Sequence, residues 1–187
     1  MDKGLIAVAR RREAWRLQAI RFCDNRRGAA AIEFAIIAAP FIALLLAVVQ
    51  TTLIMFTQQV LETTAESAGR GIRTGVVQKN GVNQSAFKTQ VCGTLPSFMS
   101  CKDVMVDVQV ANSFDALNSS TPALSYDALG NVTNSWNYKP GNTGDIVIMR
   151  VMYQAPVVLG PLGFTLANMK NGRRLLIATS VFKNESV

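Results

Sequence analysis

The chain has 187 residues, of which 49% are hydrophobic and 17% charged, with a formal net charge of +7 and no histidine. This length suits one modest domain with an accessory segment, and the lack of histidine removes the commonest general base and metal ligand. Residues 1–28 hold eight Lys and Arg against three Asp and Glu, which gives +5 there and leaves +2 elsewhere. The basic balance therefore mainly describes the N-terminal segment and is a poor argument for a nucleic-acid-binding domain.

Residues 1–28 form a basic leader with an amphipathic helical pattern, whose apolar members are Val8, Trp15, Leu17, Ile20 and Phe22. One interpretation is an arm that binds a membrane surface or nucleic acid. The other is a positively charged flank that sets the orientation of a membrane helix. We favour the second interpretation, because a long apolar run follows at once.

The apolar run extends from Ala29 to Phe56 and has no polar side chain from Phe34 to Val49. It meets the length of about 20 residues that a membrane-spanning helix needs. Pro40 lies inside the run and is predicted to kink or locally loosen the helix. Since the positive flank precedes the run, we expect a single-pass inner-membrane protein with a cytoplasmic N-terminus and a periplasmic C-terminal part.

The same helix is predicted to continue beyond the membrane. Leu61, Ala65, Ala68 and Ile72 recur at spacings of three and four, which makes one apolar stripe. Glycines at 71 and 75 are stop signals. A helix over residues 29–72 would measure about 66 Å at 1.5 Å per residue, roughly twice the thickness of a hydrocarbon core.

Three segments in the second half have strand patterns. In the first, Val104, Val106, Val108 and Val110 alternate with Met105, Asp107 and Gln109, which is typical of a half-buried strand. The others are residues 145–153 and residues 173–183. Together they predict an antiparallel sheet with one covered face, and the stripe of the helix is the expected cover. The fold class is therefore α+β, with a leader (1–28), a helix (29–72) and a sheet domain (73–187).

The connection over residues 113–144 is rich in Asn, Ser, Gly and Pro and has no clear periodicity. A connection of this length is unusual inside a compact domain. It is either a surface loop that contacts partners or a tolerated insertion, and the sequence favours neither.

Three cysteines flank the apolar run. Cys23 precedes the run and would stay reduced in the cytosol, whereas Cys92 and Cys101 follow it. In an oxidising compartment the latter two are able to form a disulfide. The alternative is that they are two small buried hydrophobic residues.

Glu33 is the one charged residue near the start of the apolar run. A charged side chain costs about 2.5–3.5 kcal/mol or more at the centre of a bilayer, so its presence needs a reason. The stretch "RRGAAAIEFAII" over residues 26–37 resembles the processing site of type IV pilin-like proteins. In that family a membrane peptidase cuts after the glycine, and a glutamate is the fifth residue of the mature chain.

The chain as a whole resembles the TadE-like family of tight-adherence (Tad/Flp) pilus assembly proteins, which are pseudopilins. The resemblance continues through Gln58, Gln59 and Glu62, and looser matches lie over residues 140–153 and 178–185. It implies that prepilin peptidase cuts the Gly28–Ala29 bond. Glu33 and Phe34 would then belong to the assembly motif, with Glu33 pairing with the new α-amino group of a neighbouring subunit.

The resemblance also implies a minor pilin-like structural or assembly component, whose partners are the membrane, prepilin peptidase, other pilins and pilus assembly proteins. We expect no enzyme, cofactor, metal site, nucleic acid or small-molecule substrate, because the sequence shows no motif for them. The alternatives are an uncleaved, signal-anchored envelope protein with a periplasmic domain that binds a ligand or partner, and a membrane-tethered enzyme. A second interpretation of Glu33, without a role in assembly, also stays open: a helix-end carboxylate that reaches the membrane interface.

Overall fold

The computed structural model describes residues 28–111, 113, 121–158 and 160–185. The expected amphipathic helix of the leader, with Trp15 and Cys23, lies outside the described residues. The chain divides into two compact units, residues 1–46 and 47–187, and the division falls inside the first described helix. The second unit contains the strands and is called the sheet unit below.

That helix, α2, comprises Ala29–Arg73 and includes Pro40. The predicted long apolar helix is thereby confirmed. Its part in the first unit exposes its apolar side chains, among them Phe34 at 73% and Ile37 at 70%. Within the described residues α2 is the one helix long and apolar enough to cross a membrane, and none of its most apolar window is buried. The fold itself therefore leaves this surface to be covered by lipid or by other chains.

The helix ends where the glycine pattern predicts. The backbone N–H of Gly75 donates to the Ile72 carbonyl at 3.0 Å, and Gly75 has a φ of 73°, in the left-handed region that glycine adopts without strain. The carbonyl of Arg73 accepts a hydrogen bond from the Glu185 N–H at 2.9 Å. The last turn of α2 is thus fixed by the end of the chain as well as by its own cap.

Three strands form one antiparallel sheet in the order β1-β2-β3, as expected for the α+β class. They are β1 (Val104–Ala111), β2 (Ile146–Ala155) and β3 (Arg174–Lys183). The register places Val106 opposite Val151 and Val151 opposite Ala178. Alternate valines of β1 therefore share one face with alternate apolar residues of β2 and β3.

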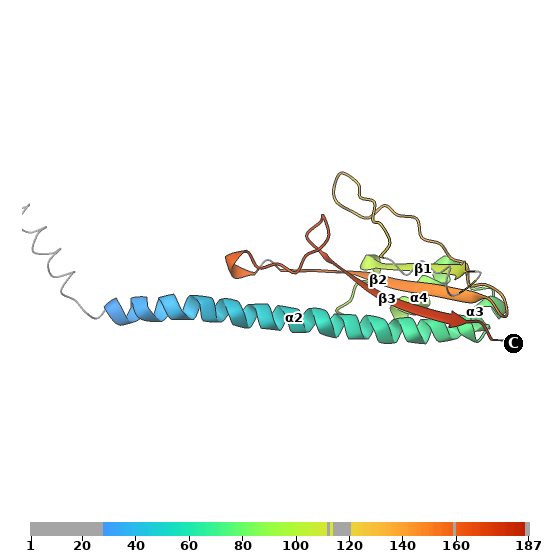
Figure 1. Ribbon diagram of the computed structural model, residues 1–187, viewed down its shortest axis with the longest axis horizontal. Coiled ribbons are helices and arrows are strands. Elements are labelled where there is room, and N and C mark those ends of the chain that lie inside the picture. The colour runs from blue at the N-terminus through green and yellow to red at the C-terminus, as the bar shows by residue number, and fades with distance from the viewer. Residues whose placement is uncertain (1–27, 112, 114–120, 159, 186–187) are drawn as a thin grey trace, which may run out of the picture. The chain divides into compact units, whose positions relative to one another are not determined.

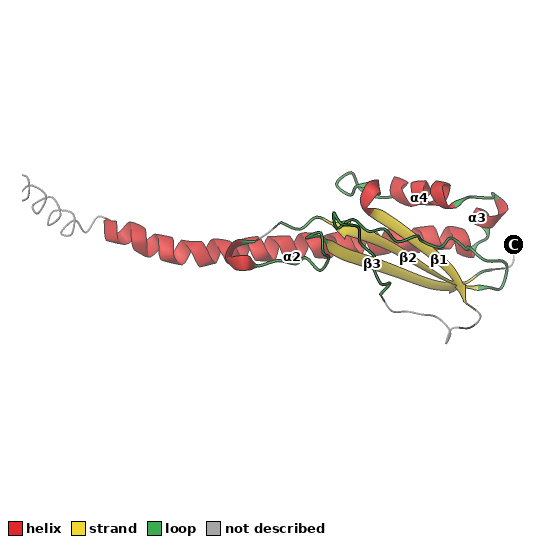
Figure 2. Ribbon diagram, turned by 90° about the horizontal axis from the view of Figure 1, so that it is seen from above, coloured by secondary structure: helices red, strands yellow, loops and turns green. Residues whose placement is uncertain are grey.

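The helix α2 covers this face (Figures 1 and 2). Leu61, Ala65 and Ile72 are at most 2% exposed and belong to one core cluster with Val104, Met149 and other inward residues of the strands. Gly69 allows the closest approach, because a Cβ at this position would lie 3.0 Å from a ring carbon of Phe182. The predicted stripe of α2 is thus the stripe that packs.

Two helices that the sequence pattern did not predict complete this layer. They are α3 (Val76–Lys79) and α4 (Gln84–Gly93), and α4 adds Phe87 and Val91 to the core. The Asn83 side chain caps α4 by accepting from the N–H of Ala86 at 2.9 Å. The helix is short and mostly polar, so it carries only a weak periodic signal.

The expectation of a sheet with one covered face is wrong for β1 and β2, although Val181 of β3, on the same outer face, is 42% exposed. Met105 is 8% exposed, Asp107 2% and Met152 0%, although all three point away from α2. The connection between β1 and β2 covers them, and Figure 1 shows it on the side of the sheet opposite α2. Its residues 137–139 line the edge of β1, where the Val108 N–H donates to the Asn137 carbonyl and the Lys139 N–H to the Val108 carbonyl, both at 2.9 Å.

Candidate functional site

The residues of the proposed processing motif lie at the start of α2. Gly28 directly precedes the helix, and an added Cβ would meet nothing within 4 Å. Ala29 is the first residue of α2. Both flank an exposed peptide bond, and an exposed bond without side-chain cover is what a protease needs to reach.

Glu33 lies four residues after Ala29, on the same face of α2, and is exposed. Phe34 beside it is also exposed. An amine created at Ala29 would stand about 6 Å along the axis from Glu33, at 1.5 Å of rise per residue. The glutamate, the aromatic side chain and the Gly28–Ala29 peptide bond therefore all lie exposed at one helix end.

Cys92 and Cys101 are joined by a disulfide whose Cα atoms are 5.5 Å apart. Cys92 belongs to α4, and Cys101 begins η2 (Cys101–Asp103), the short 3-10 turn that leads into β1. The bond thus ties the helical layer to the start of the sheet. It closes a short loop and lies outside the first unit.

A buried ion pair holds the second face of the sheet. Arg150 Nη1 donates to Asp107 Oδ2 at 3.1 Å, and the two side chains are 6% and 3% exposed. Asp107 also accepts from Gln109 Nε2 at 2.8 Å and from the Asn137 N–H at 3.0 Å. Our sequence interpretation placed Asp107 at the solvent and missed this pair. Arg150 is the one charge inside the otherwise apolar 146–153 segment, and an isolated charge in such a strand is a sequence signal for a buried partner.

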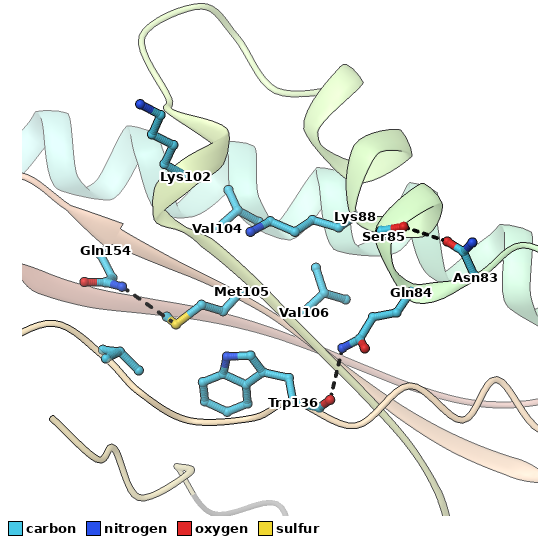
Figure 3. A pocket seen from close by; sticks show the side chains of 11 residues that line it. Asn83, Gln84, Ser85, Lys88, Lys102, Val104, Met105, Val106, Trp136 and Gln154 are labelled. Atoms are coloured by element: carbon cyan, nitrogen blue, oxygen red, sulfur yellow. Dashed lines mark hydrogen bonds between the residues drawn. The ribbon is translucent and has the colours of Figure 1, made fainter. Parts of the chain in front are cut away.

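A groove of about 620 Å³ lies between α4, β1 and the β1–β2 connection. Figure 3 shows Lys88 and Lys102 on one side of it and the indole of Trp136 on the other. Ser85 donates from Oγ to Asn83 Oδ1 at 2.8 Å, and the groove lining contains no carboxylate or histidine that would act as a base for it. The groove is lined by apolar as well as polar side chains.

Two tyrosines are withdrawn from water to different degrees: Tyr138 of the β1–β2 connection is half-buried, and Tyr153 of β2 is 2% exposed. Burial raises the pKa of Tyr138 above its ordinary value of 10.0. Its hydroxyl donates to the Val82 carbonyl at 2.9 Å, and its ring lies 5.4 Å from that of Phe87. The pKa of Tyr153 is also raised, and burial is the main cause. Tyr138 therefore ties the β1–β2 connection to the core, whereas Tyr153 is part of β2.

Groups of three or more metal-ligating side chains are absent from the part of the chain that the structure describes. Asp127 accepts from Asn131 through both its backbone N–H and its side chain, and these hydrogen bonds lower the pKa of Asp127. The carboxylate therefore stabilises an exposed turn of the β1–β2 connection.

Residues 28–70 match the family model described as TadE-like protein. This segment is TadE-like. A search of curated proteins and a search of solved structures gave no match to the chain. The TadE-like match runs from Gly28 into the part of α2 that packs on the sheet, and residues 71–187 lie beyond it.

The match confirms the family that the sequence motif resembles. TadE-like proteins are structural components associated with Tad pili. The family and the apolar helix α2 together point to a membrane-associated pilus component. The sheet, the disulfide and the groove are not part of the matched segment.

Proposed function

We propose that this protein is a minor, pilin-like component of a tight-adherence pilus, and that prepilin peptidase processes it between Gly28 and Ala29. The observation that carries the proposal is the TadE-like helix itself. The family match begins at Gly28, the helix carries a glutamate as the fifth residue after the proposed cut, and it exposes apolar side chains over residues 29–46. A surface of this kind requires lipid before assembly and other helices after it.

The role of Glu33 follows from charge. Cleavage removes a leader of +5 and creates an α-amino group at Ala29. In a helical assembly the Glu33 carboxylate of one subunit would pair with the Ala29 amine of its neighbour. Within apolar surroundings such a pair offsets part of the desolvation of both groups. It would fix the axial register of adjacent helices, because neither charge tolerates burial without the other.

The orientation also belongs to the proposal. The basic leader favours a cytoplasmic N-terminus under the positive-inside rule, and a disulfide in the sheet unit suits the oxidising periplasm. The peptidase would then act on the cytoplasmic side, and the sheet unit would be periplasmic. The groove beside Trp136 and the β1–β2 connection would be the surface that selects other pilins or assembly proteins.

Glu33→Ala tests the pairing, with Glu66→Ala as a matched control. Glu66 is an exposed glutamate on the same helix, outside the apolar run. Loss of one member of a buried ion pair costs about 3–5 kcal/mol, so we expect Glu33→Ala to be cleaved normally but to be strongly depleted from sheared pili. Glu66→Ala should be incorporated like the parent. Equal incorporation of both variants would refute the pairing, and retention of the leader would instead support an uncleaved, signal-anchored protein.

A further inference from the structure

The connection between β2 and β3 is an apolar loop beside the membrane helix. No charged residue occurs from Val151 to Met169. Val158 in this connection is 76% exposed. Two aromatic residues extend the surface, since Phe56 of α2 and Phe98 are each 54% exposed and their ring centroids are 5.9 Å apart.

An apolar groove joins these parts. It has a volume of about 370 Å³, and Leu53, Phe56, Phe98, Tyr153 and Pro156 are among its lining residues. We call the surface formed by Phe56, Phe98, Pro156 and Val158 the apolar shoulder. Exposed apolar surface of this continuity is rarely left to water in a soluble domain.

A hydrogen bond fixes the height of the apolar shoulder along α2. Gln50 Nε2 donates to the Val158 carbonyl at 2.7 Å. A hydrocarbon core accommodates about 20 helical residues. Counted from Ala29, such a span ends near Val48, and counted from Phe34 it ends near Leu53. Gln50 falls between these limits, so Val158 lies level with the edge of the hydrocarbon.

The backbone of the connection is adapted to a site poor in water. Pro156 and Pro161 have no N–H to satisfy. The Gly160 N–H donates to the Phe164 carbonyl at 2.9 Å, and the Phe164 N–H donates to the Pro161 carbonyl at 3.3 Å. The Val158 carbonyl already has the Gln50 amide as its donor. Irregular backbone is costly near lipid because its polar groups lose water, and these contacts reduce that cost.

We propose that the apolar shoulder rests in the interfacial region of the bilayer, on the side of the sheet unit, as a second membrane contact next to the span. Lipid is the occupant that the observations favour, because the patch is continuous with the apolar surface of α2 and lies level with its predicted edge. Aromatic and apolar side chains at this depth anchor a domain to the interface. The inference rests on the membrane placement of α2 that the proposed function shares, but not on cleavage after Gly28.

The test uses the full chain in phosphatidylethanolamine–phosphatidylglycerol vesicles, with Cys23→Ser and the Cys92–Cys101 disulfide kept oxidised. A nitroxide is attached at Val158→Cys, and separately at Leu129→Cys as the matched control. Leu129 is an apolar residue that is 85% exposed, on the β1–β2 connection. Both sites are exposed, so neither label displaces core side chains. Collisional broadening is then measured with oxygen, which enters lipid, and with a nickel chelate, which stays in water.

We expect the label at 158 to be broadened by oxygen and to lose broadening by nickel, while the label at 129 keeps nickel broadening. Nickel access at 158 equal to that at 129 would overturn the proposal. Protection of 158 from both reagents would also overturn it, because that result means cover by protein, such as a second copy of the chain. A label at Ile42→Cys, on the apolar run, checks the span itself, so failure of the membrane placement is distinguished from failure of the shoulder.

Discussion

The approach of α2 to the sheet at Gly69 predicts different effects on stability for two alanine substitutions in one helix. An added Cβ at Gly69 would lie 3.0 Å from Phe182 Cε1 and 3.2 Å from Ser180 Oγ, so the neighbours must move. At Gly71, two residues later, the added Cβ would meet Val77 Cγ2 at 3.5 Å, which is an ordinary contact. The two sites therefore share the helix but differ in the space around them.

Glycine to alanine inside a helix gains up to about 1 kcal/mol, and overpacking a filled site costs about 1–3 kcal/mol. Gly71→Ala should therefore raise the free energy of unfolding by up to about 1 kcal/mol. Gly69→Ala should range from nearly neutral to a loss of about 2 kcal/mol, because the same gain is set against the clash. Gly69→Ala is thus expected to be about 1–3 kcal/mol less stable than Gly71→Ala.

The assay is urea unfolding of the full chain in detergent, followed by the fluorescence of Trp136 with Trp15→Phe in every variant. Trp136 lies beside β1 and reports on the sheet unit. Equal midpoints and slopes for the two alanine variants would refute the packing of Gly69 against β2 and β3.

Three further predictions concern the sheet unit. Arg150→Met should cost about 3–5 kcal/mol of stability, because it leaves the buried Asp107 carboxylate with neutral donors only. The double variant Asp107→Asn/Arg150→Met should regain most of this stability in the same urea assay, and a double variant as unstable as the single one would contradict the pairing. The raised pKa of Tyr138 favours its neutral form in the fold, so its contribution is complete below pH 10 and is lost as the pH rises through its folded pKa. Tyr138→Phe should therefore flatten the alkaline fall in stability, and parallel pH profiles would argue against a buried phenol. The double variant Cys92→Ser/Cys101→Ser should lose about 3 kcal/mol of stability by the loop-entropy relation. Maleimide labelling of the denatured parent should find both cysteines blocked until reductant is added, and free thiols at these positions without reductant would contradict the bond.

The sequence predicted the buried faces best in segments whose apolar residues follow one helical or strand period. The stripe at Leu61, Ala65 and Ile72 predicted the buried face of α2 because each of these residues meets the same sheet. The alternating valines of β1 likewise predicted its inner face. Strand alternation alone, however, does not tell whether the other face meets water, and the cover for Asp107 comes from a connection that has no period of its own.

The rest depended on contacts between distant parts of the chain. The position of Asn137 beside Asp107 and of Val158 beside Gln50 follows from tertiary packing across 30 and 108 residues. Helix α4 was missed because ten mostly polar residues carry little periodicity. In the candidate site, the glycine-to-glutamate spacing is purely local, so the sequence alone is enough to propose residues 28–33 as a processing motif. Where the sheet unit meets its partners is a matter of surface shape that the pattern does not encode.

The most direct test of the central claim is the N-terminal residue of the protein in membranes. Intact-mass measurement and N-terminal sequencing are compared in cells with active prepilin peptidase and in cells whose peptidase is inactivated. We predict a chain that starts at Ala29 in the first case and one that retains the leader in the second. A leader that is retained in the presence of active peptidase would contradict the account.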